Sequence, residues 1–182
     1  MLFLQKKGLM GGNKREIKVW RYASLCGRLL IGDYEGKVCL CDWDLPLRAV
    51  QVVERVSRTL DAECVEGKTP LIERVIGQLE EYFEGKRSEF DLPLVVAGSD
   101  FQQRVWRELQ QIPYGEAISY LQLANRIGRP QAVRAVASAC RANAMSIIIP
   151  CHRVVGGNGS LTGYAGGLDA KQFLLDLERE NQ

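Results

Sequence analysis

The chain has 182 residues, of which 46% are hydrophobic and 25% charged, values ordinary for a soluble globular protein and enough for one domain or two small ones. No apolar run approaches the ~20 residues that a bilayer span needs. Residues 1–7 place their charge after a very short apolar patch, which is the wrong order for a secretory signal. We therefore expect an intracellular protein, cytoplasmic or, in a eukaryote, nuclear.

The first half of the chain carries patterns of a small α/β unit. Short runs rich in Val, Ile, Leu and Tyr predict a strand meander, and two later segments have the apolar spacing of helices. The strands are expected at residues 17–22, 29–34 and 37–41, and the helices at 48–60 and 70–83. Gly85 is a stop signal for the second helix, and residues 89–96 read as a connector, partly extended. We place a domain boundary there, giving an N-terminal domain at 1–95 and a C-terminal domain at 96–182.

The second half is predicted to be mainly helical. Ser99 and Gln102 form a capping-box pattern that opens a helix over 100–111, and Ser119 and Gln122 repeat it for a short helix that stops at Gly128. Pro130 then begins a helix over 130–142. Two helices joined this way form a helix-turn-helix, which is common in DNA-binding proteins, although helical hairpins are common elsewhere too.

Positive charge is concentrated in this half. The formal net charge of +2 does not indicate a nucleic acid partner, but between residues 116 and 167 one acid, Glu116, stands against five arginines: Arg126, Arg129, Arg134, Arg141 and Arg153. Such a face attracts phosphates, and a solvated helix surface is the alternative. The helix over 130–142 is otherwise rich in alanine, which permits close approach either to DNA or to a neighbouring helix.

The chain has one histidine, and it follows a cysteine in the segment Pro150-Cys151-His152-Arg153-Val154. A thiol attacks only as its thiolate, and a neutral imidazole is the side chain best suited to remove its proton near pH 7. The alternative is that Cys151 is a small buried hydrophobe and His152 a loop residue.

Five other cysteines, Cys26, Cys39, Cys41, Cys64 and Cys140, form no Cys-x-x-Cys pair, so we expect reduced thiols. Cys39 and Cys41 could share one strand face and help to bind zinc, but two buried strand thiols are the simpler interpretation. The further ligands of a zinc site are not found. We expect no metal and no other cofactor.

Several motifs together resemble the O6-alkylguanine-DNA alkyltransferases. They are the cysteine-histidine segment, Gly115-Glu116-Ala117-Ile118-Ser119-Tyr120, Arg134-Ala135-Val136 and Gly163-Tyr164-Ala165-Gly166-Gly167-Leu168. The match extends over about residues 101–178. It implies an α+β protein: a small N-terminal α/β domain with a short antiparallel sheet, then a mainly helical domain with a helix-turn-helix and the active-site cysteine. It also implies a DNA repair protein that flips a guanine alkylated at O6, or an O4-alkylthymine, into a pocket and moves the alkyl group irreversibly onto its own cysteine.

The resemblance implies a catalytic set. Cys151 corresponds to the alkyl acceptor, His152 to the base that deprotonates it through a bridging water, and Glu178 to the carboxylate that orients the imidazole. Asn143 corresponds to the hinge beside the recognition helix, and the hydroxyl of Tyr120 supports proton delivery to the leaving guanine. Because neighbours on an extended segment point to opposite sides, the water-mediated route is physically sensible.

The resemblance also implies binding residues. Arg134 corresponds to the finger that replaces the flipped base, and Ser119, Ala135 and Arg141 lie on the expected DNA side, facing the minor groove of double-stranded DNA. The expected pocket residues are Ser146, Val154, Tyr164 and Ala165. Lys171 corresponds to a lysine near Tyr120. Ala165 replaces a serine, and Ser146 a proline, of some family members. We expect a monomer.

Two other function classes are weighed against this one. A lesion-binding relative without chemistry could dispense with Cys151, His152 and Glu178, which are all present. A cysteine hydrolase gains nothing from a basic helix-turn-helix, and a thioredoxin-like oxidoreductase would require Cys-x-x-Cys. Retention of Cys151 is the feature that favours self-alkylation.

Overall fold

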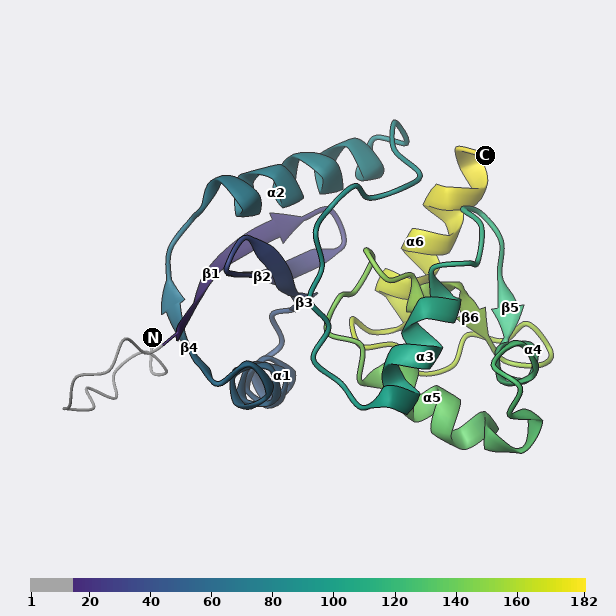
Figure 1. Cartoon of the computed structure of the whole chain (residues 1–182). Coiled ribbons are helices and arrows are strands. Elements are labelled where there is room, and N and C mark those ends of the chain that lie inside the picture. Colours follow the sequence, from purple (N-terminus) through teal and green to yellow (C-terminus); the bar gives the residue numbers. More distant parts are fainter. Residues whose placement is uncertain (1–14) are drawn as a thin grey trace.

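The computed structural model describes residues 15–182 as a four-stranded sheet with two helices, followed by a mainly helical part (Figure 1). The expected α+β class is confirmed. The strands are β1 (Arg15–Ser24), β2 (Gly27–Tyr34), β3 (Lys37–Trp43) and β4 (Ala62–Glu66). Their order is β3-β2-β1-β4, with antiparallel pairs except for β4, which pairs parallel with β1. Strands β1, β2 and β3 form the expected short antiparallel sheet, and β4 adds a parallel strand beside β1.

Two helices cover the two faces of this sheet (Figure 1). Helix α1 spans Pro46–Leu60 and helix α2 spans Pro70–Phe83. Alternate residues of the strands point to opposite faces, so Leu29 and Ile31 join the core under α2 while Leu30 joins the core under α1. Both faces of the sheet are buried under a helix, and this explains why the central residues of β2 and β3 are mostly apolar.

The helical part contains α3 (Asp100–Leu109), α4 (Tyr120–Arg126), α5 (Val133–Arg141) and α6 (Leu168–Glu180). A short parallel pair, β5 (Ile118–Ser119) and β6 (Val154–Val155), joins the start of α4 to the segment after the cysteine-histidine pair. Both expected capping boxes are present, at Ser99 and at Ser119. The helix expected over 130–142 is divided into a 3-10 turn at Pro130–Ala132 and α5.

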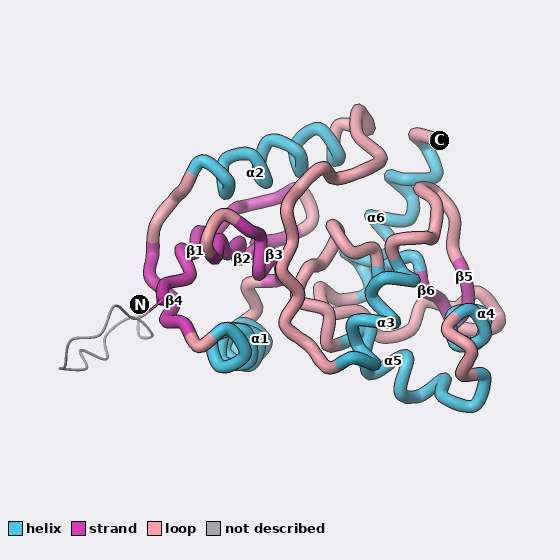
Figure 2. The backbone as a smooth tube through the Cα atoms, in the orientation of Figure 1, coloured by secondary structure: helices cyan, strands magenta, loops and turns pink. Residues whose placement is uncertain are grey.

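The segment between α2 and α3 has no regular helix or strand of its own (Figure 2). It nevertheless covers the outer edge of β3, because the Val38 amide donates to the Pro93 carbonyl and the Val95 amide to the Val38 carbonyl. These hydrogen bonds pair the backbone of Val38, which would otherwise lie unpaired at the edge of the sheet. Within residues 15–182, no helix has the length and apolar character required to cross a bilayer.

Candidate active site

Cys151 begins a short 3-10 helix, Cys151–Arg153, and only 5% of its surface is exposed. Its sulfur accepts a hydrogen bond from the side-chain amide of Asn143, at 3.4 Å. This segment was expected to be extended, which is wrong. Successive side chains on a 3-10 turn nevertheless diverge by about 120°, so Cys151 and His152 still point in different directions.

Asn143 holds the loop that leads from α5 to Cys151. Its amide nitrogen donates to the Ile149 carbonyl at 2.8 Å, and its oxygen accepts from the Met145 amide at 2.9 Å. The loop includes Ile147 at φ 72°, a conformation that a β-branched residue adopts only under constraint. Asn143 and the surrounding core supply that constraint, and the sulfur is thereby fixed relative to α5.

His152 and Glu178 form a fully buried pair, with 2.8 Å between Nε2 and Oε1. Burial lowers the pKa of His152 despite the neighbouring carboxylate, so the imidazole is neutral. An ionised carboxylate only accepts hydrogen bonds, so Nε2 must carry the proton. The other ring nitrogen, Nδ1, then keeps its lone pair, and it has no hydrogen-bond partner within residues 15–182.

Glu178 is held as an anion by several donors. Burial favours its neutral form, but the hydrogen bond from His152 and the ion pair with Arg153 outweigh it and bring its pKa to about 2. Arg153 donates Nε to Oε2 at 2.8 Å and Nη2 to Oε1 at 2.9 Å. The Gly115 amide and the hydroxyl of Tyr82 complete the set.

Arg153 therefore does not belong to a basic surface. Its guanidinium is buried, and Nη1 also donates to the Ile112 carbonyl at 2.6 Å. The expectation that it contributes to an exposed phosphate-binding face was wrong, because the charge is used inside the protein to stabilise Glu178.

Burial raises the pKa of Cys151, although the hydrogen bond from Asn143 acts in the opposite direction. The resting residue is accordingly a thiol. A cysteine that rests as a thiolate would need a lowered pKa, and burial of Cys151 acts against that. Activation must therefore accompany the reaction, with a neutral imidazole ready to take the proton.

Tyr164 lies beside His152 and connects it to an aromatic residue of the N-terminal half. Tyr164 packs edge-on against Trp43 of β3, with 5.8 Å between ring centroids, and against His152 at 6.4 Å. A Cβ at Gly166 would overlap the Trp43 indole, so glycine is required there. Ala165 is half-buried next to Tyr164, and Val154 is fully buried.

Lys171 lies in the first turn of α6 but is fully buried. Its ammonium group donates to the carbonyls of Val154 and Thr162, and lies 6.0 Å from the ring centre of Tyr120. Burial lowers the pKa of Lys171. This side chain joins α6 to β6 and to the loop before α6, with Tyr120 beside it.

The N-terminal half contacts the loop around Asn143 through charged groups. Arg48 of α1 donates to the carbonyls of Arg141 and Asn143, and Arg55 donates to that of Ala142 at 2.6 Å. These carbonyls end helix α5, where its dipole is negative, so cations stabilise them.

Ser146 is part of the same interface. Its hydroxyl donates to Asp42 of β3 at 2.7 Å, and Asp42 is paired with Arg48 at 2.8 Å. Ser146 has no exposed surface. The hydroxyl that was expected in a substrate pocket is thus already occupied within the protein.

Helix α5 presents the remaining arginines. Arg134, Ala135 and Arg141 are exposed, whereas Val136, Ala139 and Cys140 face the core. The guanidinium groups of Arg134 and Arg141 form no hydrogen bond or ion pair with any residue in 15–182. Trp106 of α3 donates to the Ala139 carbonyl at 2.8 Å, which explains the small residues on the inner side of the helix.

Two family models cover most of the chain. The 6-O-methylguanine DNA methyltransferase ribonuclease-like domain matches residues 21–96, and the DNA binding domain of the same family matches residues 100–180. The chain belongs to the 6-O-methylguanine DNA methyltransferase family.

Named relatives agree with this membership. A methylated-DNA–protein-cysteine methyltransferase of Methanosarcina barkeri is 57% identical over 104 residues, which are 57% of this chain and 66% of that protein. The constitutive methyltransferase of Bacillus subtilis is 43% identical over 159 residues, 84% of this chain and 90% of that protein. The crystal structure of Mycobacterium tuberculosis OGT in complex with DNA has a TM-score of 0.74 and 38% identity, covering 91% of this chain and 94% of that one. The chain thus spans just under two thirds of the archaeal relative and most of the other two.

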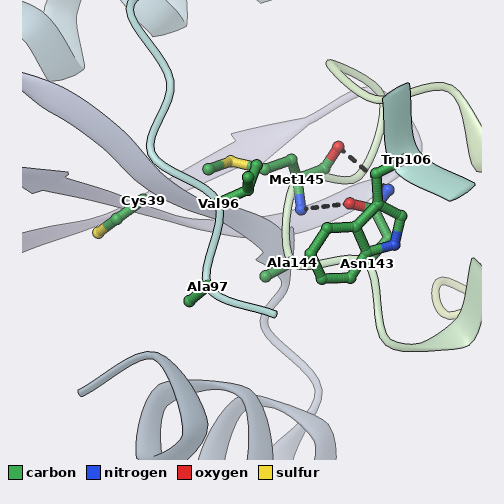
Figure 3. Close-up of a pocket in the computed structure, with 7 residues that line it drawn as sticks. All are labelled: Cys39, Val96, Ala97, Trp106, Asn143, Ala144 and Met145. Atoms are coloured by element: carbon green, nitrogen blue, oxygen red, sulfur yellow. Dashed lines mark hydrogen bonds between the residues drawn. The ribbon is translucent and has the colours of Figure 1, made fainter. Parts of the chain in front are cut away.

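A small pocket lies where the two halves of this methyltransferase-family chain meet. It is lined by Cys39, Val96, Ala97, Trp106, Asn143, Ala144 and Met145 (Figure 3). Figure 3 shows the indole of Trp106 beside Asn143, whose amide already bonds to Met145. The lining is apolar otherwise, so we assign it to packing. Among residues 15–182, no group of three or more His, Cys, Asp or Glu side chains is arranged to hold a metal ion.

The sequence did not indicate the roles of several residues at this site. Tyr82 was expected only as part of the apolar stripe of α2, and Arg153 only as surface charge. Asp42 and Arg48 were not singled out. A carboxylate inside the apolar run Val38–Trp43 was the one available signal, because a buried charge needs a partner.

Proposed function

We propose that this protein repairs DNA by transferring the alkyl group of O6-alkylguanine, and of O4-alkylthymine, to Cys151. The observation that carries the proposal is the neutral His152, whose Nε2 proton is directed to Glu178 while Nδ1 stays free as a base. The names of the relatives and the family membership support the same reaction class.

The proposed step is a displacement at an sp³ carbon. The Cys151 proton passes through a bridging water to Nδ1 of His152, and the sulfur attacks the alkyl carbon. The S–C bond forms as the C–O6 bond breaks, and the guanine leaves with its electron pair. Tyr120 supports protonation of that leaving group. Glu178 stabilises the imidazolium that results, as the third member of a nucleophile-base-carboxylate relay.

The product explains a single turnover. A thioether at Cys151 has no leaving group comparable to guanine, because expelling a thiolate from an sp³ carbon is much harder than hydrolysing an acyl intermediate. Cys140, on the inner side of α5, is buried, and burial raises the pKa of its thiol. It therefore offers no second acceptor, and each molecule is expected to repair one lesion.

Helix α5 is the proposed DNA-binding element. Its exposed, unpaired Arg134 would enter the minor groove and fill the space of the flipped base, with Ala135, Arg141 and Ser119 beside it. Tyr164, Ala165 and Val154 would line the pocket for the extruded guanine. The relative from M. tuberculosis was crystallised in complex with DNA, which supports a duplex as the partner. A monomer acting inside the cell fits this assignment.

Intact mass spectrometry tests the reaction. The protein is mixed with a duplex containing O6-methylguanine, and we expect a gain of one methyl group that peptide mapping places on Cys151. Cys140→Ala is the matched control and should react normally, whereas Cys151→Ala should not react. Unmodified protein with repaired DNA, or several products per protein molecule, would refute self-alkylation.

A further inference from the structure

Tyr82 lies in the last turn of α2, in the N-terminal half, yet its hydroxyl reaches Glu178 of the C-terminal helix. The distance from the Tyr82 hydroxyl to Oε1 is 2.7 Å, and neither side chain is exposed. Burial and the nearby carboxylate raise the pKa of Tyr82, so the phenol remains a donor across the range in which the protein works. Sequence separation of 96 residues shows that this contact is purely tertiary.

The two carboxylate oxygens of Glu178 accept different numbers of hydrogen bonds. Oε2 accepts from Arg153 Nε and from the Gly115 amide. Oε1 accepts from His152 Nε2, Arg153 Nη2 and the Tyr82 hydroxyl. Each donor to a carboxylate disperses its charge and reduces its basicity, so the donors on Oε1 compete for the same oxygen.

We propose that Tyr82 is a positioning residue for alkyl transfer: its hydroxyl shares Oε1 of Glu178 with His152, limits the pull of the carboxylate on the imidazole, and so keeps His152 neutral with Nδ1 free. The proposal rests on the proposed function, because it concerns the base of that reaction. It also makes the N-terminal half a contributor to the active site through one named atom.

Packing alone does not account for the hydroxyl. The ring of Tyr82 contacts Phe83, Phe90 and Tyr114 at centroid distances of 5.5, 5.5 and 6.1 Å, and phenylalanine would fill that space equally well. Tyr114 is the informative comparison. It lies in the same aromatic cluster and over the Arg153 guanidinium, but its buried hydroxyl has no hydrogen-bond partner within residues 15–182.

The effect on His152 has a definite direction. The ionisable groups that face the His152–Glu178 pair are Tyr82 from α2, Tyr114 from the loop before β5, Arg153 and Cys151 from the 3-10 turn, Tyr164 from the loop before α6, and Lys171 from α6. Among the tyrosines, Tyr82 alone donates to Glu178. Replacing it with Phe leaves Oε1 more basic, so the imidazolium is stabilised and His152 becomes protonated at higher pH.

The single histidine of the chain makes a direct measurement possible. Long-range ¹⁵N–¹H NMR of histidine-labelled protein gives the tautomer and the titration of one imidazole without interference. We expect the Nε2–H tautomer in the unaltered protein, protonation at higher pH in Tyr82→Phe, and an unaltered titration in Tyr114→Phe. Identical titrations in the unaltered protein and Tyr82→Phe would overturn the proposal.

Alkyl transfer provides a second readout. With the free base O6-benzylguanine as substrate, the rate constant of Tyr82→Phe should fall by about tenfold on the acid side, the effect of losing one hydrogen bond to a charged group, and should approach the unaltered rate above about pH 8. A uniform loss at all pH values would indicate a structural role and count against the proposal. If the unaltered protein transfers no alkyl group, the proposed function fails instead, and the NMR titration still decides the role of Tyr82.

A change that preserves shape covers the case in which Tyr82→Phe does not fold. 3-Fluorotyrosine incorporated at position 82 retains the ring and makes the hydroxyl a stronger donor. We expect His152 to be protonated at lower pH in that protein. A shift in the opposite direction, or none, would overturn the proposal.

Discussion

Nε2 of His152 lies 2.8 Å from Oε1 of Glu178, and neither residue has any exposed surface. Glu178→Gln removes the negative charge but retains the size of the side chain. We expect methyl transfer from duplex DNA to slow by about 10²-fold or more, within the usual contribution of a positioned acid-base pair, while DNA binding is retained. Single-turnover kinetics measure this, and Glu180→Gln, an exposed change on the same helix, is the control. Normal transfer in Glu178→Gln would remove the relay.

Stability should fall in acid because of the same pair. The pKa of Glu178 is about 2 in the folded protein and 4.5 ordinarily, so its contribution is complete above 4.5 and is lost as the pH falls towards 2. The difference corresponds to about 3 kcal/mol of unfolding free energy. His152 acts in the same direction, because its lowered pKa means that the unfolded chain binds a proton first. Urea unfolding at several pH values should show a steeper acid loss for the unaltered protein than for Glu178→Gln, and parallel curves would contradict this.

Arg134 should matter for DNA and not for chemistry. Arg134→Ala is expected to slow repair of a duplex by about 10- to 100-fold. Unstacking and unpairing a base costs a few kcal/mol, and an arginine that fills the space of the flipped base would offset part of that cost. Reaction with free O6-benzylguanine should be unchanged. Arg104→Ala, an exposed arginine of α3, is the control for general loss of charge. Equal losses on both substrates would exclude the finger role.

Arg55 should stabilise the junction between the two halves. Arg55→Met removes the donor to the Ala142 carbonyl but keeps most of the stem, and we expect a loss of about 1–3 kcal/mol in unfolding free energy. Arg58→Met changes an exposed arginine of the same helix and should stay within about 0.5 kcal/mol of the unaltered protein. Chemical denaturation measures both, and equal effects would show that the carbonyl contact contributes nothing.

Local signals predicted most of the elements. Capping boxes at Ser99 and Ser119, the apolar stripe of α2 and the glycine after it were sufficient to place three helices within a few residues. Strand β4 was missed because Ala62–Glu66 is short and two of its five residues are glutamates, and β1 offers the partner that makes it a strand.

Only those site residues that belong to a recognisable sequence motif could be predicted. Cys151 and His152 are adjacent, and Glu178 followed from the family pattern. The roles of Tyr82, Arg153, Lys171 and Ser146 depend on contacts between segments far apart in sequence, and each of these residues resembles ordinary core or surface when read alone. The 3-10 turn at Cys151–Arg153 was expected to be extended. Its conformation depends on the preceding loop, which Asn143 organises.

The hydrophobic core has a consequence for how the molecule unfolds. One continuous cluster of buried side chains includes Leu29 of β2, Leu79 of α2, Trp106 of α3 and Leu174 of α6, so the sheet under α2 and the helical part share their interior. The boundary that the sequence suggests near residue 95 therefore divides the chain in sequence, but it does not separate two hydrophobic cores that are stable independently. Neither half can lose its packing without exposing the interior of the other, so the molecule should denature in one cooperative step.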